Sequence, residues 1–384
     1  MTSTPTPGTP SAPARGLDGV VAVQTRLSHV DGQSGVLIIG GYELQELAGK
    51  VAFEEAAHLL CTGRLPTPAE AEVFSREIAA LRAIPDGAMA VVVEAAKRGA
   101  PPIDALRMGC SMLSLDGGRP NEISSEADLA NAKMLLARLP TIAAAYARAA
   151  GGREVVAPRA DLSLAANFLY MVSGEEPDPL AARALDTYWV TVIDHGMNAS
   201  TFTARVIAST RSDMVSAVTG AIGALKGPLH GGAPAEVVSQ LHEIGSPDHA
   251  EAWINAALDR GERLMGFGHR VYRAYDPRAA ALRKVAEGMS GTADWLRLAV
   301  QVEDVALRIL AERHPDRPLK TNVEYYTAAV LQGVGLPPDL YPATFALARH
   351  AGWTAHCIEQ AGVDRLIRPD VRYVGEPERD LPAG

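Results

Sequence analysis

The segment 265–278 carries residue types that bind small anions and move protons. Two glycines precede His269 there, and glycine lets a backbone approach a ligand closely because no side chain intervenes. A histidine in such a loop can donate or accept a proton near neutral pH. Arginines hold carboxylate or phosphate groups in a planar fork, and the segment supplies Arg270, Arg273 and Arg278. It therefore predicts a small-anion site with acid–base chemistry, and a solvated basic surface loop is the alternative.

Two further histidines lie in breaks between helical stretches. His195 follows Asp194 in a polar break, and His230 lies among glycines and prolines over 226–234. Loops on a rigid scaffold are where reactive side chains usually stand, so His195, His230 and His269 are candidate catalytic or binding residues. The histidines within helical stretches are predicted to be surface or hydrogen-bonded core residues; these include His58, His242, His350 and His356.

The other candidate residues carry little signal alone. Glu324 lies at the start of a predicted helix, where a carboxylate ordinarily stabilises the helix dipole. Arg349 and Arg368, taken singly, are typical of surface residues. The chain has no H-E-x-x-H motif and no closely paired cysteines, so no metal site is predicted.

The amino-acid composition limits the kinds of function that the protein can have. The 384 residues are 47% hydrophobic and 21% charged, which is typical of a globular protein with a sizeable core. The formal net charge of −9 argues against nucleic-acid binding and favours small ligands for the arginines. No apolar run reaches the roughly 18 residues of a membrane span, and the common nucleotide-binding and serine-hydrolase motifs are absent. Three separated cysteines indicate a reducing cytoplasm, and residues 1–15 are expected to form a disordered tail.

Hydrophobic periodicity predicts an almost all-α protein, with roughly fifteen or more helices of about 11–12 residues. β-Branched runs over 20–23 and 36–39 predict a small β element around Asp31–Gly32. Helix 213–225 is rich in small residues and is expected to pack closely on another helix, with a subunit interface as one candidate. The other helices are expected over 53–62, from 68, and over 127–139, 141–150, 163–172, 180–193, 235–242, 250–260, 279–289, 295–313, 322–333 and 343–361.

Several motifs occur together in a set order: Asp194-His195, Gly227-Pro-Leu-His-Gly-Gly232, Gly266-Phe-Gly-His-Arg270 with Asp276-Pro-Arg278, Asn322-Val-Glu324, and Gly352-Trp-Thr-Ala-His356. This ordered set resembles the citrate synthase family from about Gly16 to Gly375. The resemblance implies a mostly helical homodimer, with a large domain (16–228 plus 332–384) and a smaller mobile domain (229–331). It also implies condensation of an acyl-CoA, with acetyl-CoA favoured, and oxaloacetate to citrate and free CoA. No tightly bound cofactor or metal is implied.

The resemblance assigns roles by motif position. His230 would hydrogen-bond the thioester carbonyl and stabilise the enol, His269 would polarise and protonate the oxaloacetate carbonyl, and Glu324 would remove the α-proton. The implied ligands of oxaloacetate are His195, Arg278, Arg349 and, from the partner subunit, Arg368. The implied ligands of CoA are Arg273, at a phosphate, and Asn322.

Glu324 departs from the family, whose usual base is aspartate. The side chain is longer by one C–C bond, roughly 1.5 Å, and a misplacement of about 1 Å can cost about 10²-fold in rate. Because Asn322 and Val323 keep the motif, a compensating backbone position is favoured over a slow enzyme or a different acyl-CoA preference. The alternatives are a 2-methylcitrate synthase that uses propionyl-CoA, and a catalytically poor CoA- or oxaloacetate-binding sensor. A metal-dependent hydrolase is disfavoured.

Overall fold

The computed structural model describes residues 15–17, 19–115, 125–230, 234–268, 272, 274–289, 294–316, 319–376, 379 and 381. The first ten α-helices are α1 (Leu44–Leu47), α2 (Phe53–Thr62), α3 (Pro68–Ala80), α4 (Asp86–Lys97), α5 (Pro102–Met112), α6 (Ser125–Ala150), α7 (Leu164–Ser173), α8 (Pro179–Val192), α9 (Ala199–Ser209) and α10 (Met214–Leu225). The others are α11 (Pro234–Ile244), α12 (Pro247–Asp259), α13 (Pro277–Met289), α14 (Asp294–Arg313), α15 (Val323–Gly333) and α16 (Tyr341–Val363). Short 3-10 helices are η1 (Arg15–Leu17), η2 (Leu113–Leu115) and η3 (Pro338–Leu340).

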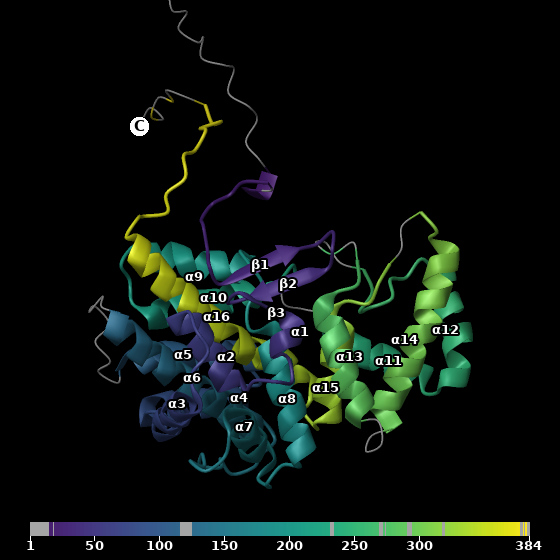
Figure 1. Ribbon diagram of the computed structural model, residues 1–384, viewed down its shortest axis with the longest axis horizontal. Coiled ribbons are helices and arrows are strands. Elements are labelled where there is room, and N and C mark those ends of the chain that lie inside the picture. The colour runs from purple at the N-terminus through teal and green to yellow at the C-terminus, as the bar shows by residue number, and fades with distance from the viewer. Residues whose placement is uncertain are drawn as a thin grey trace, which may run out of the picture.

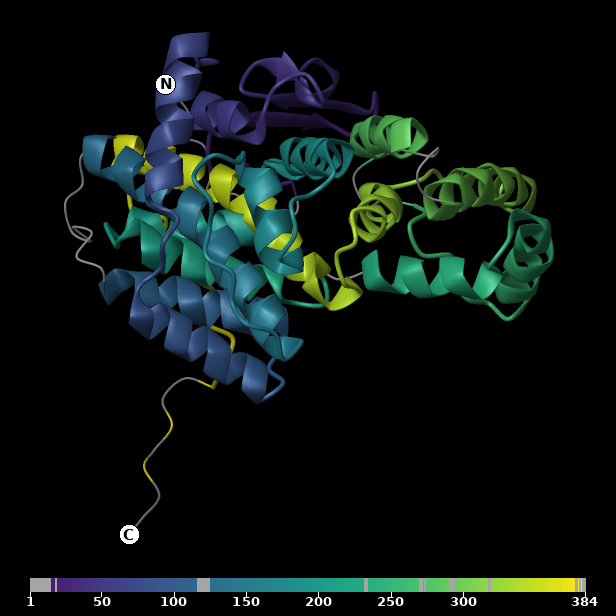
Figure 2. The same cartoon turned by 90° about the horizontal axis from the view of Figure 1, so that it is seen from below.

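The helices form a larger body and a smaller group beside it. Figure 1 shows α2 to α10 and α16 together, with α11 to α15 to one side, and Figure 2 shows the same separation from below. The predicted almost all-α architecture is confirmed over the described residues. None of the helices described is both long and apolar enough to cross a bilayer.

One small antiparallel sheet lies near the N-terminus, in the order β1 (Ser28–Asp31), β2 (Val36–Ile39) and β3 (Tyr42–Glu43). The Asp31 carboxylate accepts backbone hydrogen bonds from Gln33 and Ser34, which closes the first turn. Gly40 and Gly41 have positive φ angles of 56° and 92°, as a two-residue hairpin turn requires. The expected strand over 36–39 is confirmed, whereas the expected strand over 20–23 is wrong. That run is irregular, and Val21 is 85% exposed; without a partner strand or a buried face, its β-branched residues do not form a strand.

Local signals predicted many helix ends correctly. Thr67 and Glu70 form a reciprocal capping box at the start of α3, Ser163 caps α7, and Gly63 ends α2 in the left-handed conformation. These residues satisfy backbone groups that a helix end leaves unpaired.

In α6, tertiary packing determined the structure against the local sequence signal of a proline. The two helices expected over 127–139 and 141–150 are one helix, α6, which continues through Pro140. Leu136, Leu139 and Ile142 around that proline are fully buried, and this burial offsets the roughly 3 kcal/mol that an internal proline typically costs. Helices α1, α4, α5 and α9 were not predicted.

The small residues of α10 do permit a close helix contact. A side chain at Gly220 would overlap Ile207 of α9, so the predicted close packing is confirmed within the chain. A role of α10 between subunits stays a prediction.

Helix α16 is central to the larger body (Figure 1, Figure 2), and it contacts α2, α5, α6, α8, α9 and α10. Gly352 lies where α16 meets the end of α8. A Cβ atom there would be 2.5 Å from the Ile193 carbonyl oxygen and 2.8 Å from Asp194 Oδ1. Only glycine therefore allows α16 to approach the loop that carries Asp194 and His195.

We expect Gly352→Ala to destabilise the protein by about 1–3 kcal/mol, because the added methyl group overpacks this contact. Gly362→Ala, in the same helix, is the matched control, since a Cβ at Gly362 meets nothing within 4 Å. The control should be neutral or slightly stabilising. Denaturant unfolding midpoints measure both effects, and equal midpoints for the two variants would contradict the packing argument.

Candidate active site

Four helices bring candidate residues to one region. His195 follows the end of α8, Arg278 lies in the first turn of α13, Glu324 lies in the first turn of α15, and Arg349 lies within α16. The charge of Arg278 affects the pKa values of both Glu324 and Arg349. Arg349 in turn affects the pKa of His230. The structure therefore brings together five of the predicted residues.

Asp276 positions Arg278. Its Oδ1 accepts a hydrogen bond from Arg278 Nε at 3.0 Å, and its Oδ2 accepts one from Nη2 at 2.8 Å. The same Oδ2 accepts the backbone N–H of Val323 at 3.2 Å, which ties the start of α15 to the start of α13. Burial disfavours the charged form of Arg278, but Asp276 outweighs it and raises the Arg278 pKa.

Arg349 is a second buried cation, with 2% of its surface exposed. Its Nε donates a 2.7 Å hydrogen bond to the Val192 carbonyl, and its guanidinium lies 4.7 Å from the centre of the Phe345 ring. Burial lowers its pKa to about 10, so the side chain stays charged at neutral pH. Arg278 and Arg349 thus provide two cations for an anionic ligand.

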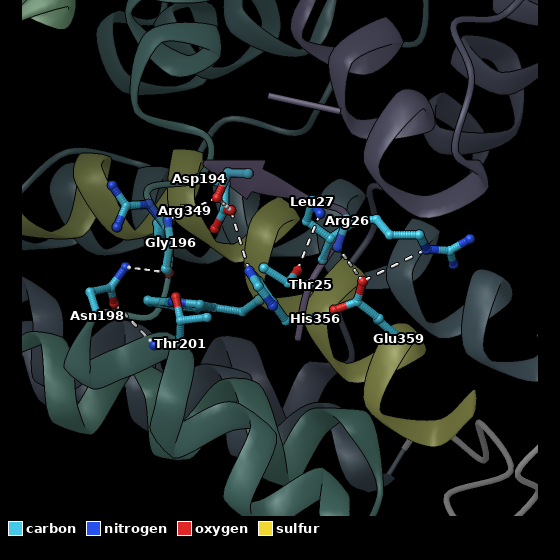
Figure 3. Close-up of polar contacts among 12 residues, drawn as sticks. Thr25, Arg26, Leu27, Asp194, Gly196, Asn198, Thr201, Arg349, His356 and Glu359 are labelled. Carbon is cyan, nitrogen blue, oxygen red and sulfur yellow. Dashed lines mark hydrogen bonds and ion pairs between the residues drawn. The ribbon is translucent and has the colours of Figure 1, made fainter. Parts of the chain in front are cut away.

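A buried network holds the loop that carries His195 (Figure 3). His356 Nδ1 accepts from Arg205 Nη1 at 2.9 Å, so His356 Nε2 carries the proton and donates to Asp194 Oδ2 at 3.3 Å. Asp194 also accepts from the Ser28 hydroxyl, whose oxygen accepts the Gly196 N–H at 2.8 Å. Although burial opposes ionisation, His356, Arg349 and Ser28 lower the Asp194 pKa.

His195 lies directly after this anchored carboxylate. Its Nε2 is 3.0 Å from the Tyr272 hydroxyl, and the two rings meet edge to face at 5.6 Å. Tyr272 also lies 5.6 Å from the Arg278 guanidinium. His195 and Arg278 therefore both lie against the side chain of Tyr272.

His230 is held in one tautomer by the N-terminus of α9. The Ser200 backbone N–H donates to its Nε2 at 3.2 Å, and the Ser200 hydroxyl lies 2.8 Å from the same atom. Because Nε2 is an acceptor, the ring proton is on Nδ1. Burial and the nearby Arg349 charge lower the His230 pKa, so a neutral imidazole with one N–H donor is favoured.

Glu324 is the available carboxylate. Its backbone N–H donates to Asn322 Oδ1 at 3.0 Å, which caps α15. Its side chain makes no hydrogen bond or ion pair with the described part of the chain. Burial raises its pKa above the ordinary value of 4.5, Arg278 opposes the rise, and Glu236 and Asp276 add to it. A carboxylate of raised pKa can take a proton from a weak carbon acid when a neutral donor stabilises the product.

Of the remaining predicted residues, only Asn322 is joined to this region by a described contact, through the backbone of Glu324. His269 and Arg273 lie outside the described residues. Arg368 is exposed, and the neighbouring Ile367 N–H donates to Ser209 at the C-terminal end of α9, whereas His230 binds the N-terminal end. Asn322 Nδ2 donates to the Gly268 carbonyl at 2.7 Å, so its carboxamide joins two loops, and its role toward CoA stays a prediction.

Several residues of the region were not predicted. Ser200 orients His230, Tyr272 contacts His195, and Ser28 supports Asp194. Asn198 before a Ser/Thr-rich run is an N-cap signal that could have placed the start of α9. Within the described ranges, no cluster of three or more His, Cys, Asp or Glu is arranged to hold a metal ion.

Several known proteins are similar to this chain in sequence and in fold. A family model described as citrate synthase, C-terminal domain, matches residues 16–370. Citrate synthase from Haloferax volcanii is 42% identical over 374 residues, covering 96% of this chain and 97% of the relative. 2-Methylcitrate synthase from Mycobacterium tuberculosis is 39% identical over 368 residues, covering 96% of this chain and 92% of the relative. The ternary complex of carboxymethyl coenzyme A and oxaloacetate with citrate synthase from Thermoplasma acidophilum matches with a TM-score of 0.86 and 31% identity, covering 96% of this chain and 97% of that chain. Since the family model matches residues 16–370 and the relatives are about 40% identical over nearly the full chain, the chain belongs to the citrate synthase family.

Proposed function

We propose that this enzyme condenses acetyl-CoA with oxaloacetate to give citrate and free CoA. The observation that carries this proposal is the buried pair of Arg278 and Arg349, because Arg278 acts on Glu324, a carboxylate of raised pKa, and Arg349 acts on His230, whose environment favours a neutral donor. Two buried arginines, Arg278 and Arg349, lie in the same region. Acyl-CoA acts as a co-substrate, and no tightly bound cofactor takes part.

The first step is removal of a proton from the methyl group of the thioester. Glu324 accepts that proton, and the thioester oxygen gains negative charge. His230 Nδ1 donates a hydrogen bond to this oxygen and stabilises the enol. Loss of one such donor typically costs about 10²–10³-fold in rate.

The enol carbon then attacks the ketone carbon of oxaloacetate. His195, Arg278 and Arg349 bind the two carboxylates of oxaloacetate, and His269, by its motif position, protonates the ketone oxygen as the carbon–carbon bond forms. Water hydrolyses the resulting thioester, which releases citrate and CoA. Arg273 and Asn322 contact CoA in this proposal.

The proposed domain division assigns the reacting groups to two bodies. His230 and Glu324 belong to the small domain (229–331), whereas His195 and Arg349 belong to the large domain (16–228 plus 332–384). Closure of the small domain would assemble the site and exclude water until the new bond has formed.

A homodimer would complete the site with Arg368 of the partner subunit. The extended segment that follows α16 supports this arrangement, because Val371 and Val374 are 91% and 89% exposed and are available to a second copy. A cytoplasmic enzyme of the tricarboxylic acid cycle fits this chemistry and the reduced cysteines.

Changes at Glu324 test the base. We expect Glu324→Ala to lower kcat by about 10²–10⁴-fold and Glu324→Asp to lower it by about 10²-fold, because the site is arranged for the longer side chain. Oxaloacetate binding by calorimetry should stay within about threefold of wild type, since the arginines remain. Glu243→Asp, on the exposed face of α11, is the control. If Glu324→Ala releases CoA thiol at the wild-type rate, Glu324 is not the base. If the wild type itself releases thiol no faster than the uncatalysed background, the protein is a sensor that only binds its ligands.

The charge of Glu236 tests the environment of the base. Glu324 must be ionised to act, so kcat should fall as pH drops through its raised pKa, which lies above 4.5. Glu236 contributes to that rise, so Glu236→Gln should move the acidic limb of the kcat profile to lower pH. Glu243→Gln on the same helix should leave the limb in place. A limb that moves to higher pH, or that stays unchanged in Glu236→Gln, would contradict this account.

A 2-methylcitrate synthase is the second candidate, since a relative of that name is 39% identical over nearly the full chain. One methylene typically changes discrimination by about 1–3 kcal/mol. We expect kcat/KM to be about tenfold or more higher for acetyl-CoA than for propionyl-CoA. A preference for propionyl-CoA would reverse the order of the two candidates.

A further inference from the structure

Apart from the candidate active site, a pocket with a volume of about 270 Å³ lies between α8 and α13, beside α1. These three helices pack against one another (Figure 1). None of the lining residues is among the candidate ligands of oxaloacetate or CoA. The volume is many times the roughly 10–15 Å³ needed for one water molecule, so the pocket has room for an organic molecule.

The lining is apolar with a cationic edge. Ala184, Val285 and Met289 form part of its wall, and Arg183 and Lys284 supply two positive charges. No Asp or Glu lines the pocket. In a chain with a net charge of −9, two cations at one apolar pocket without a lining carboxylate are unusual.

Both cations retain free hydrogen-bond donors. Arg183 Nη2 donates to the Gly49 carbonyl at 3.0 Å, which leaves the rest of its guanidinium available. Lys284 makes no hydrogen bond or ion pair with any residue described here. An anion at this edge would replace water on both side chains and gain charge-assisted hydrogen bonds.

We propose that this pocket binds a small organic anion, a carboxylate on an apolar body. The apolar part lies against Ala184, Val285 and Met289, and the carboxylate meets Arg183 and Lys284. Pockets of this kind combine apolar walls with a few polar groups that orient the ligand.

The pocket is also placed to affect the active site. Helix α8 leads to His195. On α13, Arg278 lies about one turn before Ala281, the first residue of that helix to line the pocket. An occupant that changes the spacing of α8 and α13 changes the spacing of these two oxaloacetate ligands. Its binding is therefore coupled to oxaloacetate binding, and this second step rests on the proposed function.

Calorimetry with octanoate tests the pocket. Octanoate should bind saturably to the full-length wild type, and octan-1-ol and octylammonium should bind at least about tenfold more weakly, because they lack the negative charge. Lys284→Glu should weaken octanoate binding by about tenfold or more, whereas Lys97→Glu on α4 should not. Equal binding of octanoate and octylammonium would overturn the proposal.

A larger side chain at Gly288 can be used to fill the pocket. A Cβ at Gly288 meets nothing within 4 Å, and the residue lines the pocket. We expect Gly288→Phe to occupy the space and weaken octanoate binding by about tenfold or more, while Gly288→Ala retains it. Equal affinity in the two variants would place octanoate elsewhere and overturn the site.

The coupling between the pocket and the active site is measured by the oxaloacetate Kd. The oxaloacetate Kd should shift by about threefold or more when octanoate is saturating, and the shift should vanish in Gly288→Phe. A shift that persists in Gly288→Phe would mean direct competition at the active site, and no shift in wild type would overturn the coupling. Failure of oxaloacetate to bind at all would contradict the proposed function, whereas octanoate binding that depends on residue 288 would still support the pocket.

Discussion

The Asp194 carboxylate is completely buried at the junction of α8, α16 and β1. A buried charge costs several kcal/mol unless it is paired and hydrogen-bonded. Here the partners are His356 from α16 and Ser28 from β1, and Arg349 adds a nearby positive charge. Both hydrogen bonds go to Asp194 Oδ2, and the two donors come from distant parts of the sequence. They fix the loop after α8 and so determine the position of His195. The position of His195, a proposed ligand of oxaloacetate, is thus set by a neighbouring carboxylate that is fully buried.

The same arrangement of charge decides which groups carry protons. Arg349 helps to keep His230 neutral, and Arg278 limits the rise in the Glu324 pKa. In the proposed reaction a dianionic substrate binds beside these arginines, and its charge offsets that of Arg278 at Glu324. The Glu324 pKa would then rise further, so the carboxylate becomes a stronger base when the second substrate is in place. Under the proposed mechanism, oxaloacetate binding and the strength of the base are linked through the Arg278 guanidinium.

Sequence patterns predicted elements with strong local signals and missed those that depend on tertiary packing. The capping box at Thr67 and the left-handed Gly63 are local, and both were placed correctly. The continuation of α6 through Pro140 depends on burial from several sides, which no local pattern encodes. In the candidate site, motif order proposed His230 and Glu324, whose roles stay predictions. Ser200 and Tyr272 were missed because hydroxyl groups are common and their contacts span 30 and 77 residues of sequence.

The glutamate at position 324 is best understood from the carboxylate beside it. Asp276 binds both the Arg278 guanidinium and the Val323 backbone N–H, so one side chain sets the spacing between the proposed oxaloacetate ligand and the backbone of the proposed base. Asn322 caps the same helix start and joins it to the Gly268 loop. With the backbone held at both points, the first turn of α15 cannot move without breaking buried hydrogen bonds. If Glu324 is the base, as proposed, its reach depends on side-chain length, and a glutamate in place of the usual aspartate requires the start of α15 to lie correspondingly farther from the reacting carbon.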